Sequence, residues 1–202
     1  MGKRGPYAKG LARREEILAR GLEVIATEGY AGASVHRIAE AAGLSKTGLL
    51  HHFDSKEELL TEILRKRDEA DDPGLDEHSA QLADLEGAYA RIVQRNADIP
   101  GLVELFTRLS IEAADPQHPA HEFFLHRDRE LAERMARSIE RAGGGSTGLP
   151  ASAQTMALIL LALTDGLQLR WLRDPEVDMA GTLTVPFELL ERAMSDGAER
   201  AP

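Results

Sequence analysis

Apolar residues recur at helical spacing along almost the whole chain. Leu18, Leu22 and Ile25 fall on one face of a helix predicted over 11–28, and Gly29 is typical of the position just after a helix end. Further helices are predicted over 82–96, 102–114, 119–142, 151–173 and 178–194. Because no range alternates like a strand, the pattern predicts an all-α protein of about nine helices.

After the first of these helices comes the range 34–60, SVHRIAEAAGLSKTGLLHHFDSKEELL, whose polar residues are typical of helix starts and turns. Ser34 is suited to cap one short helix, and Gly43 is suited to the turn that follows it. Ser45 is suited to cap a second short helix. Asp54 is predicted to start a longer helix, with Glu57 three residues on as in a capping box. This order predicts a helix-turn-helix braced by a third helix.

In a helix-turn-helix, the second helix lies in the major groove of DNA and its first residues meet base edges. Lys46 and Thr47 begin that helix here, and Gly48 permits a close approach of the backbone. The predicted DNA contacts are Arg4, Ser34, His36, Arg37, Ser45, Lys46, Thr47, Gly48, Leu50, His51, His52 and Lys56. The pair His51–His52 could instead bind a metal, but adjacent residues point apart on a helix.

The net charge of −10 argues against a nucleic-acid partner until its distribution is considered. Residues 1–67 hold 12 Lys and Arg against 9 Asp and Glu, whereas residues 68–202 hold 12 against 25. A basic head on an acidic body suits a protein that presents one face to phosphate, although an acidic body also simply aids solubility. The cations at 3, 4, 9, 13 and 14 form either an arm that touches DNA or a frayed terminus.

Several classes of protein and site are disfavoured by what the sequence lacks. It has no cysteine, no apolar run of about 18 residues and no apolar segment behind its basic N-terminus. A cytoplasmic protein without disulfides or a membrane span is therefore expected. No Gly-rich phosphate loop, nucleophile elbow or HExxH motif is present, so neither an enzyme nor a cofactor is expected. His118, His121 and His126 suggest a metal sensor, but their spacing does not place all three on one helical face, so no metal site is predicted.

The range 34–60 closely resembles the DNA-binding region of the TetR/AcrR family of transcriptional regulators. The likeness rests on Ile38-Ala39, on Ala-Gly-Leu-Ser at 42–45, on His52-Phe53 and on Ser-Lys-Glu-Glu-Leu-Leu at 55–60. It implies a homodimer in which each chain has a helix-turn-helix DNA-binding head, here 1–53, and a larger helical ligand-binding and dimerisation body, here 54–202. Two positions depart from the family pattern: Leu50 stands where many members have a Tyr that contacts phosphate, and Gly48 where many have Thr.

The resemblance also implies an effector pocket in the body and dimerisation through the last two helices. The range 156–163, which is too apolar to face water, agrees with the second implication. The candidate effector contacts are Tyr89, Phe106, Arg108, Phe123, Phe124, Met135, Asp165, Gln168 and Trp171. Each of them could instead pack the core, and Asp165, a carboxylate in an apolar helix, needs a partner in either case.

These observations predict a ligand-responsive DNA-binding regulator, most simply a repressor that binds a near-palindromic operator as a homodimer and is released by a small molecule. In this hypothesis, the ligand shifts the helix that follows Asp54 and so changes the spacing of the two heads. That helix is taken as the one element that touches both head and body. The alternative is a helical ligand-binding or scaffolding protein without specific DNA binding.

Overall fold

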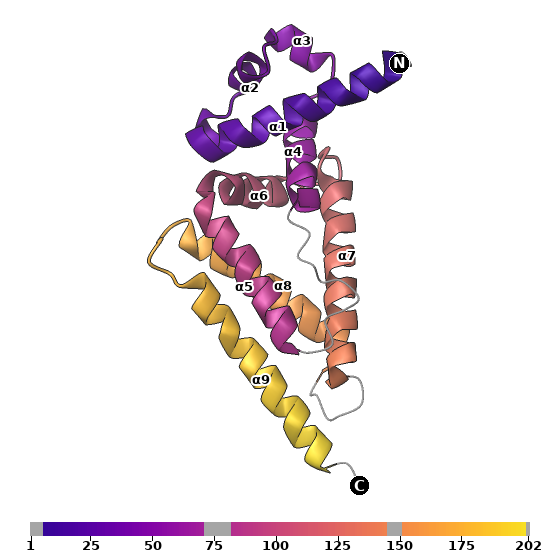
Figure 1. The fold of residues 1–202 in the computed structure, drawn as a ribbon, viewed down its shortest axis with the longest axis vertical. Helices are drawn as coiled ribbons and strands as arrows, with labels where there is room; N and C mark the ends of the chain where they lie inside the picture. The colour runs from indigo at the N-terminus through magenta and orange to yellow at the C-terminus, as the bar shows by residue number, and fades with distance from the viewer. Residues whose placement is uncertain (1–5, 71–81, 145–150, 201–202) are drawn as a thin grey trace, which may run out of the picture. The chain divides into compact units, whose positions relative to one another are not determined.

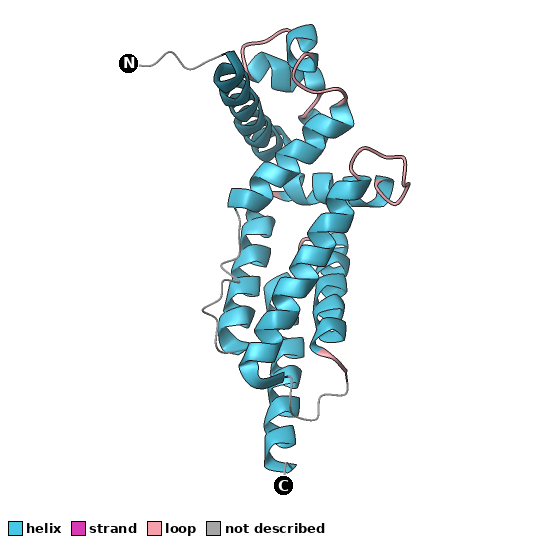
Figure 2. Cartoon of the chain, turned by 90° about the vertical axis from the view of Figure 1, so that its right-hand side faces the viewer, coloured by secondary structure: helices cyan, strands magenta, loops and turns pink. Residues whose placement is uncertain are grey.

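A computed structural model describes residues 6–70, 82–144 and 151–200 of the chain. These residues form nine α-helices (Figure 1): α1 Pro6–Gly32, α2 Val35–Ala41, α3 Lys46–Leu50, α4 Lys56–Ala70, α5 Leu82–Asp98, α6 Pro100–Glu112, α7 His121–Ile139, α8 Ala153–Trp171 and α9 Met179–Arg200. A short π-helix, Glu140–Gly144, directly follows α7. No strand occurs among the described residues (Figure 2). The all-α prediction is confirmed, and α1 and α9 run further than the sequence pattern indicated.

The chain divides into two compact units. The first comprises Met1–Asp71 and Ile99–Phe123 and holds α1 to α4 with α6; the second comprises Asp72–Asp98 and Phe124–Pro202 and holds α5, α8, α9 and most of α7. Packing thus groups α4 and α6 with the helix-turn-helix. The predicted boundary between residues 53 and 54 separates expected functions rather than packed units, and it stays a prediction.

In the first unit, α1 packs against α2, α4 and α6 (Figure 1). The approach of α6 to α1 is close enough to require glycine: a Cβ atom on Gly101 would lie 2.5 Å from the carbonyl oxygen of Ile25 and 2.9 Å from the Cα atom of Gly29. Gly29 itself has a φ of 72°, which interrupts the helical geometry of α1. The hypothesis that the helix after Asp54 alone joins head and body is therefore wrong, because α6 packs directly on α1 and α4.

The start of α4 also differs from the prediction. Its cap is Ser55, whose Oγ accepts a hydrogen bond from the backbone N–H of Glu58 at 3.0 Å, while the Glu58 carboxylate accepts one from the backbone N–H of Asp54. The predicted box of Asp54 and Glu57 is thus shifted by one residue. Asp and Ser are equally good caps by themselves. An additional bond from Arg14 to Glu58 accompanies the observed register.

In the second unit, α5 and α8 both pack against α9. The rings of Tyr89 on α5 and Phe187 on α9 lie 6.1 Å apart. Helix α9 begins at Met179 and continues through Pro186. Among the described helices, none combines the length and hydropathy that a membrane span requires.

Helix α8 buries only one of its faces within the single chain. That face consists of Ala153, Ala157, Leu160, Thr164, Leu167, Gln168 and Trp171. On the other face, Leu158 is 54% exposed and Ile159 is 50% exposed. The range 156–163, which the sequence marks as too apolar to face water, thus has exposed apolar residues in the single chain. An exposed apolar surface of this kind is typical of an interaction site.

Candidate nucleic-acid interface and ligand site

The two short helices α2 and α3 begin at the predicted serines. Ser34 Oγ accepts a hydrogen bond from the backbone N–H of Arg37 at 3.1 Å, and Ser45 Oγ accepts one from the backbone N–H of Gly48 at 3.0 Å. Gly43, with a φ of 66°, supplies the left-handed turn between them. Leu49 anchors α3 in the core and is fully buried. Local sequence thus determines where both helices start and how the chain turns between them.

The polar side of α3 faces away from this core. Lys46, Thr47, Leu50 and His51 are all exposed, and Leu50 is 38% exposed. Helical spacing places Leu50 beside both Lys46 and Thr47, since it follows them by four and three residues. The predicted recognition residues are therefore brought together on one outward surface, which we call the α3 surface (Lys46, Thr47, Leu50 and His51).

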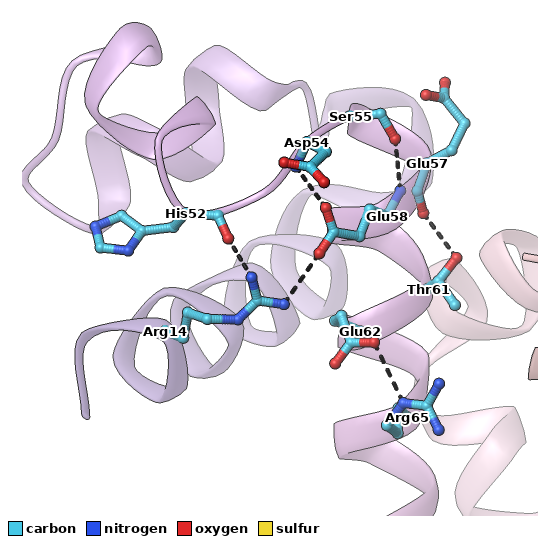
Figure 3. A network of polar contacts seen from close by, with 9 residues as sticks. All are labelled: Arg14, His52, Asp54, Ser55, Glu57, Glu58, Thr61, Glu62 and Arg65. Atoms are coloured by element: carbon cyan, nitrogen blue, oxygen red, sulfur yellow. Dashed lines mark hydrogen bonds and ion pairs between the residues drawn. The ribbon is translucent and has the colours of Figure 1, made fainter. Parts of the chain in front are cut away.

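Arg14, on α1, holds the end of α3 and the start of α4 in place (Figure 3). Its Nη1 donates to the backbone carbonyl of His52, and its Nη2 donates to the Glu58 carboxylate at 3.1 Å. The guanidinium also stacks 4.2 Å from the ring centre of Phe53. Arg13, its neighbour, donates to the carbonyl of Ala42 at 2.7 Å. The interpretation of these two arginines as part of an N-terminal arm is therefore wrong, since both belong to α1 and support the helix-turn-helix.

The other predicted DNA contacts are placed less uniformly. Arg37 is held in ion pairs with Glu28 at 2.7 Å and Glu40 at 2.8 Å, and the hydrogen bonds that its guanidinium donates to Glu28 and then to Glu40 raise the pKa of that guanidinium. Lys56 lies 6.0 Å from the ring centre of Tyr30. His36 is exposed and His52 is half-buried. Arg4 lies outside the described residues.

Six of the nine predicted effector contacts lie in the second unit. Five of them are buried: Tyr89, Phe124, Met135, Gln168 and Trp171. The sixth, Asp165, is exposed as a residue of the single chain. Burial, followed by the negative charge of Asp165, raises the pKa of Tyr89, while Arg127 and a hydrogen bond with Thr164 oppose the rise. Tyr89, Thr164 and Asp165 thus form a polar group among apolar helices, which we call the Tyr89 cluster.

The remaining three predicted effector contacts, Phe106, Arg108 and Phe123, belong to the first unit. Arg108 is exposed, binds Glu104 at 2.8 Å and lies 5.3 Å from the ring centre of Tyr30. Its grouping with the Tyr89 cluster stays a prediction. The guanidinium of Arg65 lies over the ring of Phe123, 5.0 Å from the ring centre.

The three histidines considered as a metal sensor each have a local partner of their own. The Nδ1 atom of His118 accepts from the backbone N–H of Ala120 at 3.2 Å, and Nδ1 of His121 lies 2.8 Å from the carbonyl oxygen of Ala113. His126 pairs with Glu130 at 3.3 Å. No group of three metal-binding side chains is found in the ranges that the structure describes.

Comparisons with known proteins decide the family. The family model for bacterial regulatory proteins of the tetR family matches residues 17–63, which hold the helix-turn-helix and its supports. The chain is 36% identical over 108 residues to the HTH-type transcriptional repressor KstR2 of Rhodococcus jostii, a match that covers 54% of this chain and 46% of that protein. The chain belongs to the TetR family of transcriptional regulators.

Two further relatives extend the likeness of this TetR-family chain beyond the head. It is 29% identical over 168 residues to the repressor AcnR of Corynebacterium efficiens, a match that covers 78% of this chain and 81% of that protein. A TetR-family regulator of known structure from Agrobacterium tumefaciens is 25% identical, with a TM-score of 0.69 over 91% of this chain and 98% of that one. The match to KstR2, by contrast, spans about half of that relative's length.

Sequence reasoning missed several residues of this TetR-family chain that support its candidate sites. Arg14 was grouped with a terminal arm, although its position three and four residues before buried Ile17 and Leu18 places it at the edge of the apolar face. Thr164 and Arg127 were not singled out, because nothing local distinguishes them from ordinary helix residues. Their role follows only from their proximity to Tyr89 and Asp165.

Replacing Arg14 by Ala is expected to destabilise the first unit by about 2–3 kcal/mol, because two charge-assisted hydrogen bonds and the contact with Phe53 are lost together. Urea unfolding and amide hydrogen exchange in 45–60 measure the loss. Arg20→Ala is the matched control, since Arg20 is an exposed α1 arginine that pairs with Glu23, three residues along the helix. Its loss should be below about 0.5 kcal/mol. Equal losses in both variants would refute the assigned role of Arg14.

Asp165 makes stability depend on pH. Burial raises the pKa of its carboxyl to about 6, the nearby Arg127 opposes this rise and Asp128 adds to it. Because Asp165 is also open to solvent in the single chain, water screens part of the effect, so we expect a midpoint between 3.8 and 6.

The folded protein therefore binds this proton more tightly than the unfolded chain does. The stability contributed by the protonated carboxyl is present at low pH and is lost as pH rises through the raised pKa. From about pH 4.5 to 7.5, the free energy of unfolding of the natural protein should fall by about 1 kcal/mol more than that of Asp165→Asn. The difference is measured from the urea midpoints of the two proteins. If both proteins show the same pH dependence, the carboxyl titrates normally.

Proposed function

We propose that this chain is a ligand-responsive transcriptional repressor that binds a near-palindromic operator as a homodimer. The observation that carries the proposal is the α3 surface, where Lys46, Thr47, Leu50 and His51 lie exposed on a helix anchored by Leu49 and supported by Arg14. The names of KstR2 and AcnR, both repressors, support the same function. Binding to the chromosome would place the protein in the cytoplasm.

In the proposed complex, α3 enters the major groove, so that Lys46 and Thr47 meet base edges. His51 and Lys56 would donate to phosphates on either side and fix the position of the helix. Phosphate contacts of this kind release counterions, so affinity should fall steeply with salt for every DNA sequence. Only the base contacts would distinguish the operator.

Two heads are needed because one short helix makes too few contacts for specific affinity. Exposed apolar side chains on α8 and α9 offer a surface that a second copy would cover. On α8 these are Leu158, Ile159 and Leu169, and on α9 they are Val185 at 52% and Leu189 at 59% exposure. The spacing of 185 and 189, like that of 158 and 169, places each pair on one helical face. A homodimer through these two helices would bury both apolar faces.

Charged residues in this surface should prevent the dimer. Leu158→Glu combined with Leu189→Glu is expected to give a folded monomer, because two unpaired carboxylates per chain would be buried against apolar partners. Sedimentation equilibrium measures the mass. Ile111→Glu is the matched control, since Ile111 is an exposed isoleucine of α6 at 66% and should leave the mass unchanged. A dimer that persists in the double variant would place the interface elsewhere.

The Tyr89 cluster is the proposed contact for the polar part of an effector. The buried amide of Gln168 and the hydroxyl of Tyr89 can each donate or accept a hydrogen bond with an effector, and Asp165 can accept one from a cationic or hydroxylated group of the effector. Phe124, Met135 and Trp171 would contact the apolar part. An effector releases DNA only to the extent that it binds the released form better, about 10⁴-fold for a shift from 1:99 to 99:1.

A mobility-shift assay on the DNA that flanks the protein's own gene tests the proposal, repeated at rising salt. The expected result is a sequence-selective shift that survives a large excess of unrelated DNA. A folded dimer that shifts all sequences equally, or none, would favour the alternative of a helical ligand-binding or scaffolding protein.

A further inference from the structure

Leu50 differs in chemistry from the rest of the α3 surface. It is 38% exposed, whereas its neighbour Leu49 is fully buried, so the two leucines point to opposite sides of one short helix. Its neighbours on the outward side are Lys46 and Thr47, both polar. Single exposed leucines are common on proteins and need no explanation by themselves. This one lies among the residues proposed to meet DNA bases.

The major groove offers one apolar group to such a side chain. Guanine, cytosine and adenine present only donors and acceptors there, while thymine adds its C5 methyl group. A leucine side chain can neither donate nor accept a hydrogen bond. Against a donor or acceptor it would remove water without replacing its hydrogen bonds, which is unfavourable. Against the thymine methyl, the leucine side chain and the methyl group both leave water, which contributes favourably to the free energy of binding.

We propose that Leu50 is a specificity-determining residue that selects a thymine in each half of the operator through contact with the C5 methyl group. The inference rests on the proposed function, because it requires α3 to lie in the major groove. Beyond the proposed function, Leu50 would have two effects on base preference. The methyl group is preferred, and bases with polar edges at the same position are disfavoured.

The size of the effect follows from the area of one methyl group. Removing that group from the contact is expected to weaken binding by about 4-fold in one half of the operator, and by about 15-fold when both halves are changed. Phosphate contacts are untouched by this change, so the dependence on salt should stay the same.

The experiment starts with selection of duplexes from a random library by the full-length protein. Each thymine of the selected operator is then replaced, one at a time, by deoxyuridine, which lacks only the C5 methyl group. Affinity is measured for the natural protein, for Leu50→Ala and for Leu11→Ala. Leu11 is the matched control, since it is an exposed leucine of α1 at 48% exposure.

We expect one thymine per half-site at which deoxyuridine weakens binding by the natural protein and by Leu11→Ala. Leu50→Ala should bind thymine and deoxyuridine equally at that position while keeping its other preferences. Circular dichroism confirms that the variant is folded. The inference fails if no position responds to deoxyuridine, or if Leu50→Ala keeps the full response. A library that yields no enriched sequence would instead contradict the proposed function itself.

Discussion

Replacing Lys46 and Thr47 together by Ala is expected to abolish the preference for the proposed operator while leaving the protein folded and its oligomeric state unchanged. Both side chains are exposed at the start of α3, so their loss should change stability little. Each good base contact discriminates by about 1–3 kcal/mol, and the proposed dimer would present each residue twice. The ratio of operator affinity to unrelated-DNA affinity should therefore fall by at least about 100-fold.

The matched control for this pair is Lys9→Ala with Thr27→Ala. These are the same residue types, exposed on α1 of the same unit. Removing the cation at position 9 can lower the affinity for all sequences alike, but the ratio between operator and unrelated DNA should stay unchanged. Competition binding at fixed salt measures the ratio. An unaltered choice of operator in the Lys46 and Thr47 variant would show that α3 does not read the bases.

Replacing Gly101 by Ala is expected to cause a large loss of stability in the first unit. The new Cβ would meet the Ile25 carbonyl oxygen at 2.5 Å, the Gly29 Cα at 2.9 Å and the Tyr30 backbone nitrogen at 3.2 Å. All three are backbone atoms, so no side chain can rotate away. Separating α6 from α1 should cost about 3 kcal/mol or more.

Hydrogen exchange in α1 and α6 is the suitable measurement, because Trp171, the single tryptophan, lies in the second unit and does not report on the first. Gly10→Ala is the matched control: nothing lies within 4 Å of a Cβ built there, and Gly10 is inside α1. That change should stabilise the helix by about 0.5–1 kcal/mol. If the two variants exchange alike, α6 does not depend on this close approach.

The packing of α6 bears on how an effector could act on the head. Helices α1 and α4 both contact α6 within the first unit, so a shift of α6 would reach the helix-turn-helix through α1 as well as through α4. Helix α7 begins in the first unit and continues into the second after Phe123. We therefore expect that substitutions in α6, such as Gly101→Ala, weaken the response to effector as well as stability.

The helix-turn-helix was predictable because its determinants are local. Ser34, Gly43 and Ser45 act within three residues of their own position, so composition and spacing are enough to locate caps and turn. The register of the α4 cap was not predictable in the same way. Asp54 and Ser55 are both good caps, and the ion pair between Glu58 and Arg14, 44 residues apart, accompanies the observed one.

The sequence by itself determined the all-helical class, the position of the recognition helix and the residues on its outward face, because these depend on periodicity and short-range hydrogen bonds. Tertiary structure alone decided that Arg14 belongs to the support of α3 and that α6 packs on α1. The physical reason is that these outcomes depend on contacts between residues distant in the chain. A side chain such as arginine, which suits phosphate and carboxylate equally, carries no local sign of its partner.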